Sequence, residues 1–333
     1  MKAKDPITVE AYRSKATMPA PYSKDKALMK LITGVDTPLE TDTADYTTKG
    51  GLKKEAQQFG ERIEVRENIK GFGWSWKVPD FDEKDASLIK GVLRGLPKDS
   101  EVSWALRALC DKLNTKAELG RKLRWTRDQT LCPQCSAQGE SHRQTLKHVL
   151  NTCPVSLRNG RFLSRHTAVL REIISRLRMA NKEKDNFHLW ADLEGENKNE
   201  DFPEGFPLIH VRKYIPDIMM TFSEGEAEKL VIIELTCPYE DKNGAERAHL
   251  RKEKKYQALV DEIRIKKHYD EIELHCIEIG SRGHIANTLN GIQKYLQCPR
   301  GTKTVRNFLM ELGRVSLLRS MEIYRLKDAT LAL

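Results

Sequence analysis

Four closely spaced metal-ligand residues in the middle of the chain constrain its fold more than any other feature. Cys132 and Cys135 are followed by His148 and Cys153 in the pattern C-x2-C-x12-H-x4-C. Two cysteines separated by two residues can bind one metal ion from a tight turn. Three thiolates and one imidazole then complete the tetrahedral shell of a structural zinc site. We therefore predict a CCHC zinc knuckle over residues 129–158 that binds Zn²⁺ through these four side chains.

Two alternatives to this assignment stay open. His142 could replace His148 as a ligand, although the ten residues between His142 and Cys153 are a less typical spacing. The cluster could also be a chance grouping of buried thiols. The chain has seven cysteines, an odd number, and shows no secretory signal, so a disulfide framework is not expected. In a reducing compartment, clustered cysteines are better interpreted as metal ligands.

The charge of the chain favours a polyanionic partner. Lysine and arginine number 57 against 48 acidic residues, which gives a formal net charge of +9, and basic side chains release counterions from phosphates. The sequence has no run of about 18 apolar residues, so no membrane span or membrane partner is expected. Basic residues flank and enter the Cys/His segment, where they predict contacts with a DNA or RNA backbone, unless they form an ordinary solvated face: Arg121, Lys122, Arg124, Arg127, Arg143 and Lys147.

Hydrophobic periodicity predicts an α/β fold. Residues 1–78 are irregular, and residues 183–206 are acidic and polar, which is typical of a loop. Residues 84–121 are predicted to be helical, because apolar residues recur three and four apart at 86–93 and 104–113, with Pro97 between these stretches. Further helices are predicted at 157–179, 245–267, 285–296 and 305–326. Short apolar runs bounded by turn residues predict strands at 208–209, 218–219, 230–235 and 271–279. Helices and strands in this order suit a sheet flanked by helices.

Two acidic residues lie in apolar, strand-like surroundings. Asp217 follows Pro216 and precedes Ile218, and Glu234 lies within the run 230–235. A carboxylate in such a run is costly to bury unless it is paired or bound to a metal. On adjacent strands, the two acids could hold Mg²⁺ or Mn²⁺ through their oxygens, and such an ion can activate water against a phosphodiester. The alternative is a pair of ordinary surface acids at strand ends.

A basic helix follows the second acid and places two lysines on its inward face. Ala248, Lys252, Lys255, Tyr256 and Leu259 are spaced so that they share one face of the helix at 245–267. A lysine on this face could stabilise charge beside a bound ion. The alternative is a solvated basic helix whose lysine stems lie along the surface.

Taken in order, these motifs resemble the C-terminal part of site-specific non-LTR retrotransposon polyproteins. That family carries a zinc knuckle followed by a restriction-like endonuclease of the P-D…(D/E)-x-K superfamily. The resemblance covers about residues 100–325 and includes, beside the Cys/His pattern, Arg165-His166, Pro216-Asp217, Glu234 with Pro238-Tyr239-Glu240, Ala248…Lys252…Lys255-Tyr256 and Gly280-Ser281-Arg282-Gly283. No single motif is specific, but the order of all six is.

The resemblance implies a restriction-endonuclease-like core, a mixed sheet flanked by helices, that nicks target DNA with Mg²⁺ or Mn²⁺. In the family, the freed 3′ hydroxyl primes reverse transcription. By position, Asp217 and Glu234 resemble the catalytic metal ligands. Lys252 or Lys255 resembles the catalytic lysine, with Tyr256 beside it.

The resemblance also extends the nucleic-acid contacts and exposes two departures. Arg165 and Arg282 join the expected nucleic-acid-binding residues. The usual superfamily pattern has lysine two residues after the second acid, where this chain has Thr236. The chain also contains no adjacent pair of aspartates, so the reverse transcriptase core is absent.

We accordingly predict five segments, with target DNA and element RNA as partners. They are an irregular N-terminal segment (1–78), interpreted as a remnant of a polymerase thumb or linker, a helical basic segment (79–128), the CCHC knuckle (129–158), the endonuclease domain (159–300) and a C-terminal helix (301–333). The substrate implies residence in the nucleus, or otherwise in the cytoplasm. The alternatives are a non-catalytic zinc-dependent DNA- or RNA-binding protein and an inactive retrotransposon fragment.

Overall fold

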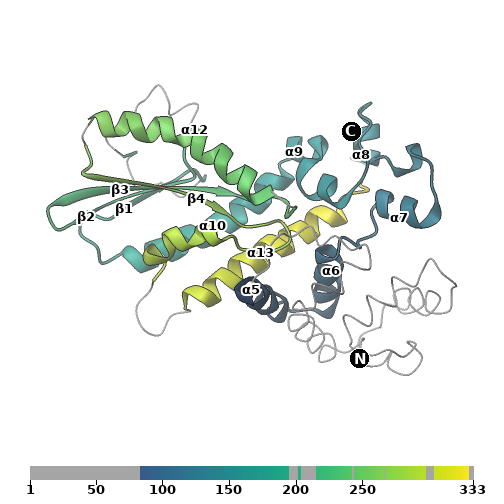
Figure 1. The fold of residues 1–333 in the computed structure, drawn as a ribbon, viewed down its shortest axis with the longest axis horizontal. Coiled ribbons are helices and arrows are strands. Elements are labelled where there is room, and N and C mark those ends of the chain that lie inside the picture. The colour runs from purple at the N-terminus through teal and green to yellow at the C-terminus, as the bar shows by residue number, and fades with distance from the viewer. Residues whose placement is uncertain are drawn as a thin grey trace. The chain divides into compact units, whose positions relative to one another are not determined.

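The computed structural model of the chain (Figure 1) describes residues 83–194, 202–203, 215–241, 244–266, 268–297 and 304–329. The expectations for residues 1–78 and for a strand at 208–209 lie outside the described residues. The chain divides into two compact units after Asn114. This division falls inside the predicted segment 79–128 and places the Cys/His segment and the sheet in the same unit.

The described part of the first unit consists of two helices, α5 (Glu83–Arg94) and α6 (Asp99–Leu109). They confirm the two helices predicted on either side of Pro97. The Glu101 carboxylate accepts a hydrogen bond from the Lys98 backbone N–H at 3.2 Å, which satisfies a free donor at the start of α6. Apolar residues of both helices, such as Leu93 and Val102, are fully buried.

Short helical turns open the second unit and carry the Cys/His segment. They are α7 (Lys116–Leu123), η2 (Asp128–Thr130), α8 (Pro133–Ser136), the π-turn η3 (His148–Thr152) and α9 (Pro154–Arg158). At the start of α7, the Thr115 hydroxyl accepts a hydrogen bond from the Glu118 N–H at 3.2 Å, as expected for an N-cap residue.

A four-stranded mixed sheet forms the centre of the second unit. Its strands are β1 (His188–Ala191), β2 (Ile218–Glu224), β3 (Ala227–Thr236) and β4 (Glu271–Glu278), in the order β1-β2-β3-β4. The pairs β1–β2 and β2–β3 are antiparallel, whereas β3 and β4 are parallel. Parallel neighbours require a crossover connection, which here is the helix α12 (Gly244–Lys266).

The structure corrects one part of the predicted secondary structure. Residues 183–206 were expected to form a loop, but β1 lies within them and pairs with β2 at the edge of the sheet. Leu189 and Ala191 are buried while His188 is exposed, so the strand does alternate. Four residues between polar flanks are too few for this alternation to stand out in the sequence.

Helices cover both faces of the sheet (Figure 1). On one face, Met219, Leu230 and Ile232 pack against apolar residues of α12, among them Leu259 and Ile263. The helices α10 (Arg161–Asn181) and α13 (Val305–Arg325) lie on the other side of the sheet. The predicted helix at 285–296 is a 3-10 helix, η4 (Asn287–Tyr295).

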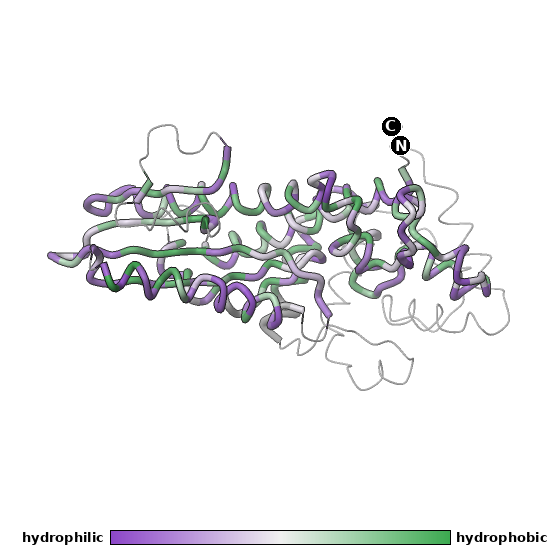
Figure 2. Tube along the Cα trace, turned by 90° about the horizontal axis from the view of Figure 1, so that it is seen from above, coloured by the Kyte–Doolittle hydropathy of each residue, from purple (hydrophilic) through white to green (hydrophobic). Residues whose placement is uncertain are grey.

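The distribution of apolar residues agrees with these layers. Figure 2 shows apolar residues along the strands and an alternation of apolar and polar residues along the long helices. Such helices bury one stripe against the sheet and expose the other to solvent. Within the described ranges, no helix is both long enough and apolar enough to cross a membrane.

Candidate metal centres

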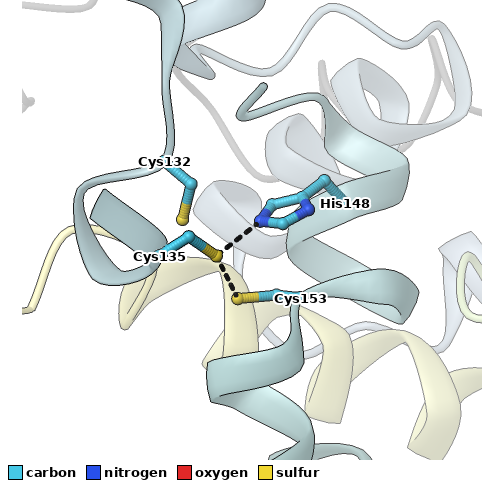
Figure 3. A group of neighbouring side chains, drawn as sticks. All are labelled: Cys132, Cys135, His148 and Cys153. Carbon is cyan, nitrogen blue, oxygen red and sulfur yellow. Dashed lines mark hydrogen bonds between the residues drawn. The ribbon is translucent and has the colours of Figure 1, made fainter. Parts of the chain in front are cut away.

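The four predicted zinc ligands converge on one point in the second unit (Figure 3). The sulfur atoms of Cys132, Cys135 and Cys153 and a ring nitrogen of His148 all lie within 4.8 Å of one another, and all four residues are buried. The Cys135 Sγ lies 3.7 Å from the Cys153 Sγ and 3.4 Å from the His148 Nε2. Tetrahedral zinc with Zn–S bonds of about 2.3 Å places two sulfur atoms about 3.8 Å apart. The group could therefore bind a metal such as zinc.

Local backbone geometry brings these ligands together. Pro133 begins the short helix α8, where a missing N–H is tolerated, and this turn brings Cys132 and Cys135 to one side. The Cys132 N–H donates to the His142 carbonyl at 2.7 Å, which closes the loop between the two halves of the group. The π-turn η3 then carries His148 and ends just before the last cysteine.

The thiols interact strongly even without an ion. A hydrogen bond with Cys132 lowers the pKa of Cys153, and burial raises the pKa of Cys135 to about 11. A metal ion binds cysteine as the thiolate, so a divalent ion would displace thiol protons on binding. The exposed His142 ring stacks on His148, with centroids 5.5 Å apart, and does not belong to the group. The structure thus favours His148 over His142 as the ligand.

The two predicted acidic residues meet at one end of the sheet. Asp217 directly precedes β2, Glu234 lies near the end of β3, and the antiparallel register that pairs Ile218 with Ile233 places the two acids opposite each other. The Asp217 backbone N–H donates to the Glu234 Oε2 at 3.1 Å. The Asp217 Oδ2 accepts a hydrogen bond from the Leu235 N–H at 2.7 Å. Two acids 17 residues apart in the sequence therefore lie at the same end of the sheet.

Glu234 is a buried acid with a cation beside it. Its side chain is 2% exposed, and its Oε1 contacts the Nζ of Lys252, whose side chain is 22% exposed. Burial and the charge of Asp217 raise the pKa of Glu234. Desolvation and repulsion between like charges are both relieved by a nearby positive charge. The arrangement is therefore suited to a cation, and carboxylate oxygens are ligands that Mg²⁺ accepts.

Helix α12 turns the other predicted catalytic residues toward this end of the sheet. Tyr256 is buried and Lys252 and Lys255 are half-buried, whereas the residues between the two lysines are exposed. The Lys255 Nζ donates to the Tyr256 hydroxyl at 2.8 Å, and this hydroxyl donates to the Ile215 carbonyl at 3.0 Å. Burial lowers the pKa of Lys255 and raises that of Tyr256. The Nζ of Lys252, one of the two candidate lysines, contacts the Glu234 carboxylate.

Two residues at this end of the sheet were not among the predicted site residues. The His166 Nε2 on α10 lies 3.2 Å from the Asp217 Oδ2 and 3.3 Å from the Leu235 carbonyl. Burial opposes protonation of His166, but the hydrogen bond to Asp217, the charge of Asp217 and the hydrogen bond to the Leu235 carbonyl together raise its pKa. Asp192, just after β1, donates its backbone N–H to the Asp217 carbonyl at 3.0 Å. Desolvation and the charge of Asp217 raise the pKa of Asp192.

The basic residues predicted around the Cys/His segment lie mostly on the surface. Five of them are exposed and Lys122 is half-buried, the exposed ones being Arg121, Arg124, Arg127, Arg143 and Lys147. Arg121 and Lys122 both pair with Glu118, at 2.7 and 3.5 Å, and Lys147 pairs with Asp241. Ion pairs at the surface contribute little to stability, so these side chains could exchange their partners for phosphate.

Arg165 and Arg282, which were predicted to contact nucleic acid, are buried inside the fold. They are 2% and 3% exposed. Arg165 donates to the carbonyls of Leu150 and Cys237 at 3.0 and 3.3 Å. The Nε of Arg282 donates to the Glu240 carboxylate at 3.2 Å. A buried guanidinium that donates to internal acceptors would have to abandon them to reach a phosphate, at a cost of several kcal/mol.

The second unit thus carries two groups of polar side chains with different chemistry. The Cys/His group offers three sulfurs and one imidazole nitrogen, and the end of the sheet offers two carboxylates and a lysine. Soft ligands select zinc, whereas oxygen ligands select Mg²⁺ or Mn²⁺.

In comparisons with known proteins, no family model matches the chain, and no curated protein matches its sequence.

Proposed function

We propose that the chain is a metal-dependent DNA endonuclease in which Asp217 and Glu234 bind Mg²⁺ or Mn²⁺. One observation carries the proposal. Two acids lie at the same end of one sheet, Asp217 directly before β2 and Glu234 on β3, where the Asp217 N–H donates to the Glu234 carboxylate and the Lys252 Nζ contacts that carboxylate. A pair of ordinary surface acids would not explain the burial of Glu234, which is 2% exposed. A simple structural ion pair between Glu234 and Lys252 would not explain the second acid, because Asp217 adds repulsion.

A divalent ion at these carboxylates would polarise a phosphodiester and lower the pKa of a water molecule that attacks it. The chain itself holds both acids in place. The Leu235 N–H binds Asp217, and the Asp217 N–H binds Glu234, so little reorganisation is needed to receive an ion. Lys252 would supply a positive charge next to the developing charge on the phosphate once the ion replaces it at Glu234.

The Cys/His group has a structural part in this proposal. If all four side chains bind zinc, no coordination position remains open for chemistry. Zinc would therefore stabilise the fold of residues 129–158 and present the exposed basic residues beside it, such as Arg143 and Lys147, to the DNA backbone.

The wider proposal is that the chain is the restriction-like endonuclease region of a non-LTR retrotransposon and nicks target DNA in the nucleus. The mixed sheet between α12 and α10, with one acid at β2 and one on β3, supports a restriction-like core. Thr236 occupies the position of the usual superfamily lysine. Lys252 from α12 contacts Glu234 in its place, which supports a catalytic lysine taken from the later helix.

Nicking of a supercoiled plasmid by zinc-loaded protein tests the proposal. We expect nicking in buffer that contains Mg²⁺ or Mn²⁺. We expect no nicking in buffer that contains a chelator and no added divalent ion. Asp217→Asn and Glu234→Gln should each reduce the rate at least about 100-fold while DNA binding and zinc content stay unchanged. Asp261→Asn is a matched control, because this exposed aspartate lies on α12 two turns beyond the site and pairs with Arg264 at 3.4 Å.

Three results are informative. Loss of nicking in both site variants but not in Asp261→Asn supports the endonuclease. Equal nicking by the wild type and Asp217→Asn would mean that a contaminating nuclease is responsible, and the proposal would fail. DNA binding without nicking in the wild type would favour the second candidate, a zinc-dependent DNA- or RNA-binding protein, which the exposed arginines of the Cys/His segment also support.

A further inference from the structure

Two consecutive residues of α10, Arg165 and His166, bind the end of β3 immediately after its buried acid. The His166 Nε2 contacts the carbonyl of Leu235, at 3.3 Å, and the Arg165 guanidinium donates to the carbonyl of Cys237, at 3.3 Å. These carbonyls follow Glu234 by one and three residues in the sequence. The helix therefore holds the backbone that determines where the Glu234 carboxylate lies.

The His166 contact extends to the second acid. The same Nε2 lies 3.2 Å from the Asp217 Oδ2. A carboxylate oxygen and a carbonyl oxygen are both acceptors, so Nε2 must carry the proton and donate to them. One imidazole N–H is thus shared between the Asp217 carboxylate and the backbone next to Glu234, and this restricts rotation of the Asp217 side chain.

The Arg165 contacts extend to the Cys/His segment. Its guanidinium also donates to the Leu150 carbonyl at 3.0 Å and to the Ser320 hydroxyl at 3.0 Å. Leu150 lies between two members of the Cys/His group, on the turn η3. Asn151, the next residue, donates to the same Cys237 carbonyl at 2.7 Å. The carbonyl of Cys237 is therefore one point at which the Cys/His segment is joined to the backbone that follows Glu234.

Helix packing alone would not need polar side chains at these positions. Arg165 is 2% exposed, and a buried guanidinium costs several kcal/mol in lost hydration unless its hydrogen bonds recover that cost. An apolar residue would cover the sheet without this cost. Arg165 and His166 add hydrogen bonds of defined direction, because the Arg165 Nη atoms and the His166 Nε2 meet backbone carbonyls, the Ser320 hydroxyl and the Asp217 carboxylate.

We propose that Arg165 and His166 are positioning residues that hold Asp217 and the backbone after Glu234 in a geometry ready for a divalent ion, and that Arg165 ties this geometry to the Cys/His segment. The inference rests on the proposed function, because it concerns the same pair of acids. Groups that hydrogen-bond to a metal ligand commonly change metal affinity about 10- to 100-fold when they are replaced.

Mn²⁺ binding to the zinc-loaded full chain, measured by electron paramagnetic resonance, tests the inference with no assay of activity. His166→Gln and His166→Asn differ mainly in reach, since the glutamine amide nitrogen can occupy the place of Nε2 whereas the asparagine amide is too short. We expect Mn²⁺ affinity close to that of the wild type for His166→Gln and a loss of about 10-fold or more for His166→Asn. Arg165→Lys should also weaken Mn²⁺ binding, because one ammonium cannot replace the planar fork.

Controls separate this inference from the proposed function. Zinc content and the thermal unfolding midpoint identify variants that have lost their fold, and His268→Asn changes an exposed histidine beyond α12. If His166→Asn, His166→Gln and Arg165→Lys all bind Mn²⁺ as the wild type does, the positioning role is overturned and the acid pair stands. If His166→Asn and His166→Gln lose Mn²⁺ affinity equally, the claim that the hydrogen bonds of the His166 Nε2 position the acids is overturned. If the wild type binds no Mn²⁺, or Glu234→Gln binds it equally well, the proposed function fails and the inference falls with it.

Discussion

Replacing Lys252 by methionine isolates the charge that faces the buried Glu234. Methionine keeps most of the length and the apolar stem of lysine, so the change removes the ammonium with little loss of packing. In the chain without a divalent ion, Glu234 would then keep its burial and its repulsion from Asp217 but would lose the cation in contact with its Oε1. The variant should therefore be less stable than the wild type.

The exposures of the two partners set the size of this effect. Removing one member of a buried ion pair costs about 3–5 kcal/mol. Glu234 is 2% exposed but Lys252 is 22% exposed, so water already screens part of the interaction and the lower end, about 3 kcal/mol, is the better estimate. For a unit of the size of Thr115–Leu333, each kcal/mol shifts the midpoint by about 2–4 °C. A fall of about 6–12 °C is therefore expected.

Thermal unfolding by circular dichroism without and with Mg²⁺ measures this effect. Lys254→Met is the matched control, because Lys254 lies on the same helix with an exposed side chain, and its change should stay within about 0.5 kcal/mol. Added Mg²⁺ should reduce the deficit of Lys252→Met, since the ion supplies the missing positive charge. Equal midpoints for the two variants, or a deficit that Mg²⁺ leaves unchanged, would refute the reasoning.

Three further predictions follow from other parts of the second unit. Cys153→Ser should lower the zinc content from about one per chain, as measured by atomic emission, whereas Cys276→Ser, outside the group, should not. Burial and the charge of Asp217 raise the pKa of Glu234, so its contribution to the stability of the Mg²⁺-free chain is lost as pH rises from the ordinary glutamate range through the raised pKa. Urea titrations should show that the free energy of unfolding of Glu234→Gln increases relative to that of the wild type over this pH range. A difference that stays constant with pH would contradict the assignment. The double variant Arg143→Gln/Lys147→Gln should bind DNA more weakly, and the slope of log K against log salt concentration should become shallower by about one to two. Fluorescence anisotropy at several salt concentrations measures this slope, and an unchanged slope would contradict the prediction.

The Cys/His group could be predicted from the sequence because its information is local. Cys132 and Cys135 lie within one turn of backbone, and His148 and Cys153 are also close together. Their residue types alone indicate the metal. The strands β3 and β4 and the helix α12 could be predicted for a related reason, since long apolar patterns are retained whatever the tertiary contacts are.

The surroundings of the acid pair could not be predicted in the same way. Arg165 and His166 lie on a helix whose periodicity identifies its buried face, but the sequence does not tell which strand end that face meets. A charged residue next to the Cys/His segment therefore suggested a contact with nucleic acid, whereas Arg165 donates to Leu150 and Cys237 inside the fold. Burial of an arginine depends on partners more than 70 residues away in the sequence, such as Cys237, and no local pattern encodes such partners.

Lys252 and a divalent ion compete for the same carboxylate, and this competition leads to one further prediction. The ammonium contacts the Glu234 Oε1, so an ion that binds Glu234 must first displace it. Removing the ammonium removes the competitor, and Lys252→Met should bind Mn²⁺ more tightly than the wild type in an electron paramagnetic resonance titration. The same variant should nick plasmid more slowly, because the positive charge near the phosphate is gone. Tighter ion binding with slower cleavage would separate the role of Lys252 in the reaction from a role in holding the ion. Weaker Mn²⁺ binding with unchanged nicking would show instead that Lys252 only supports the fold around Glu234.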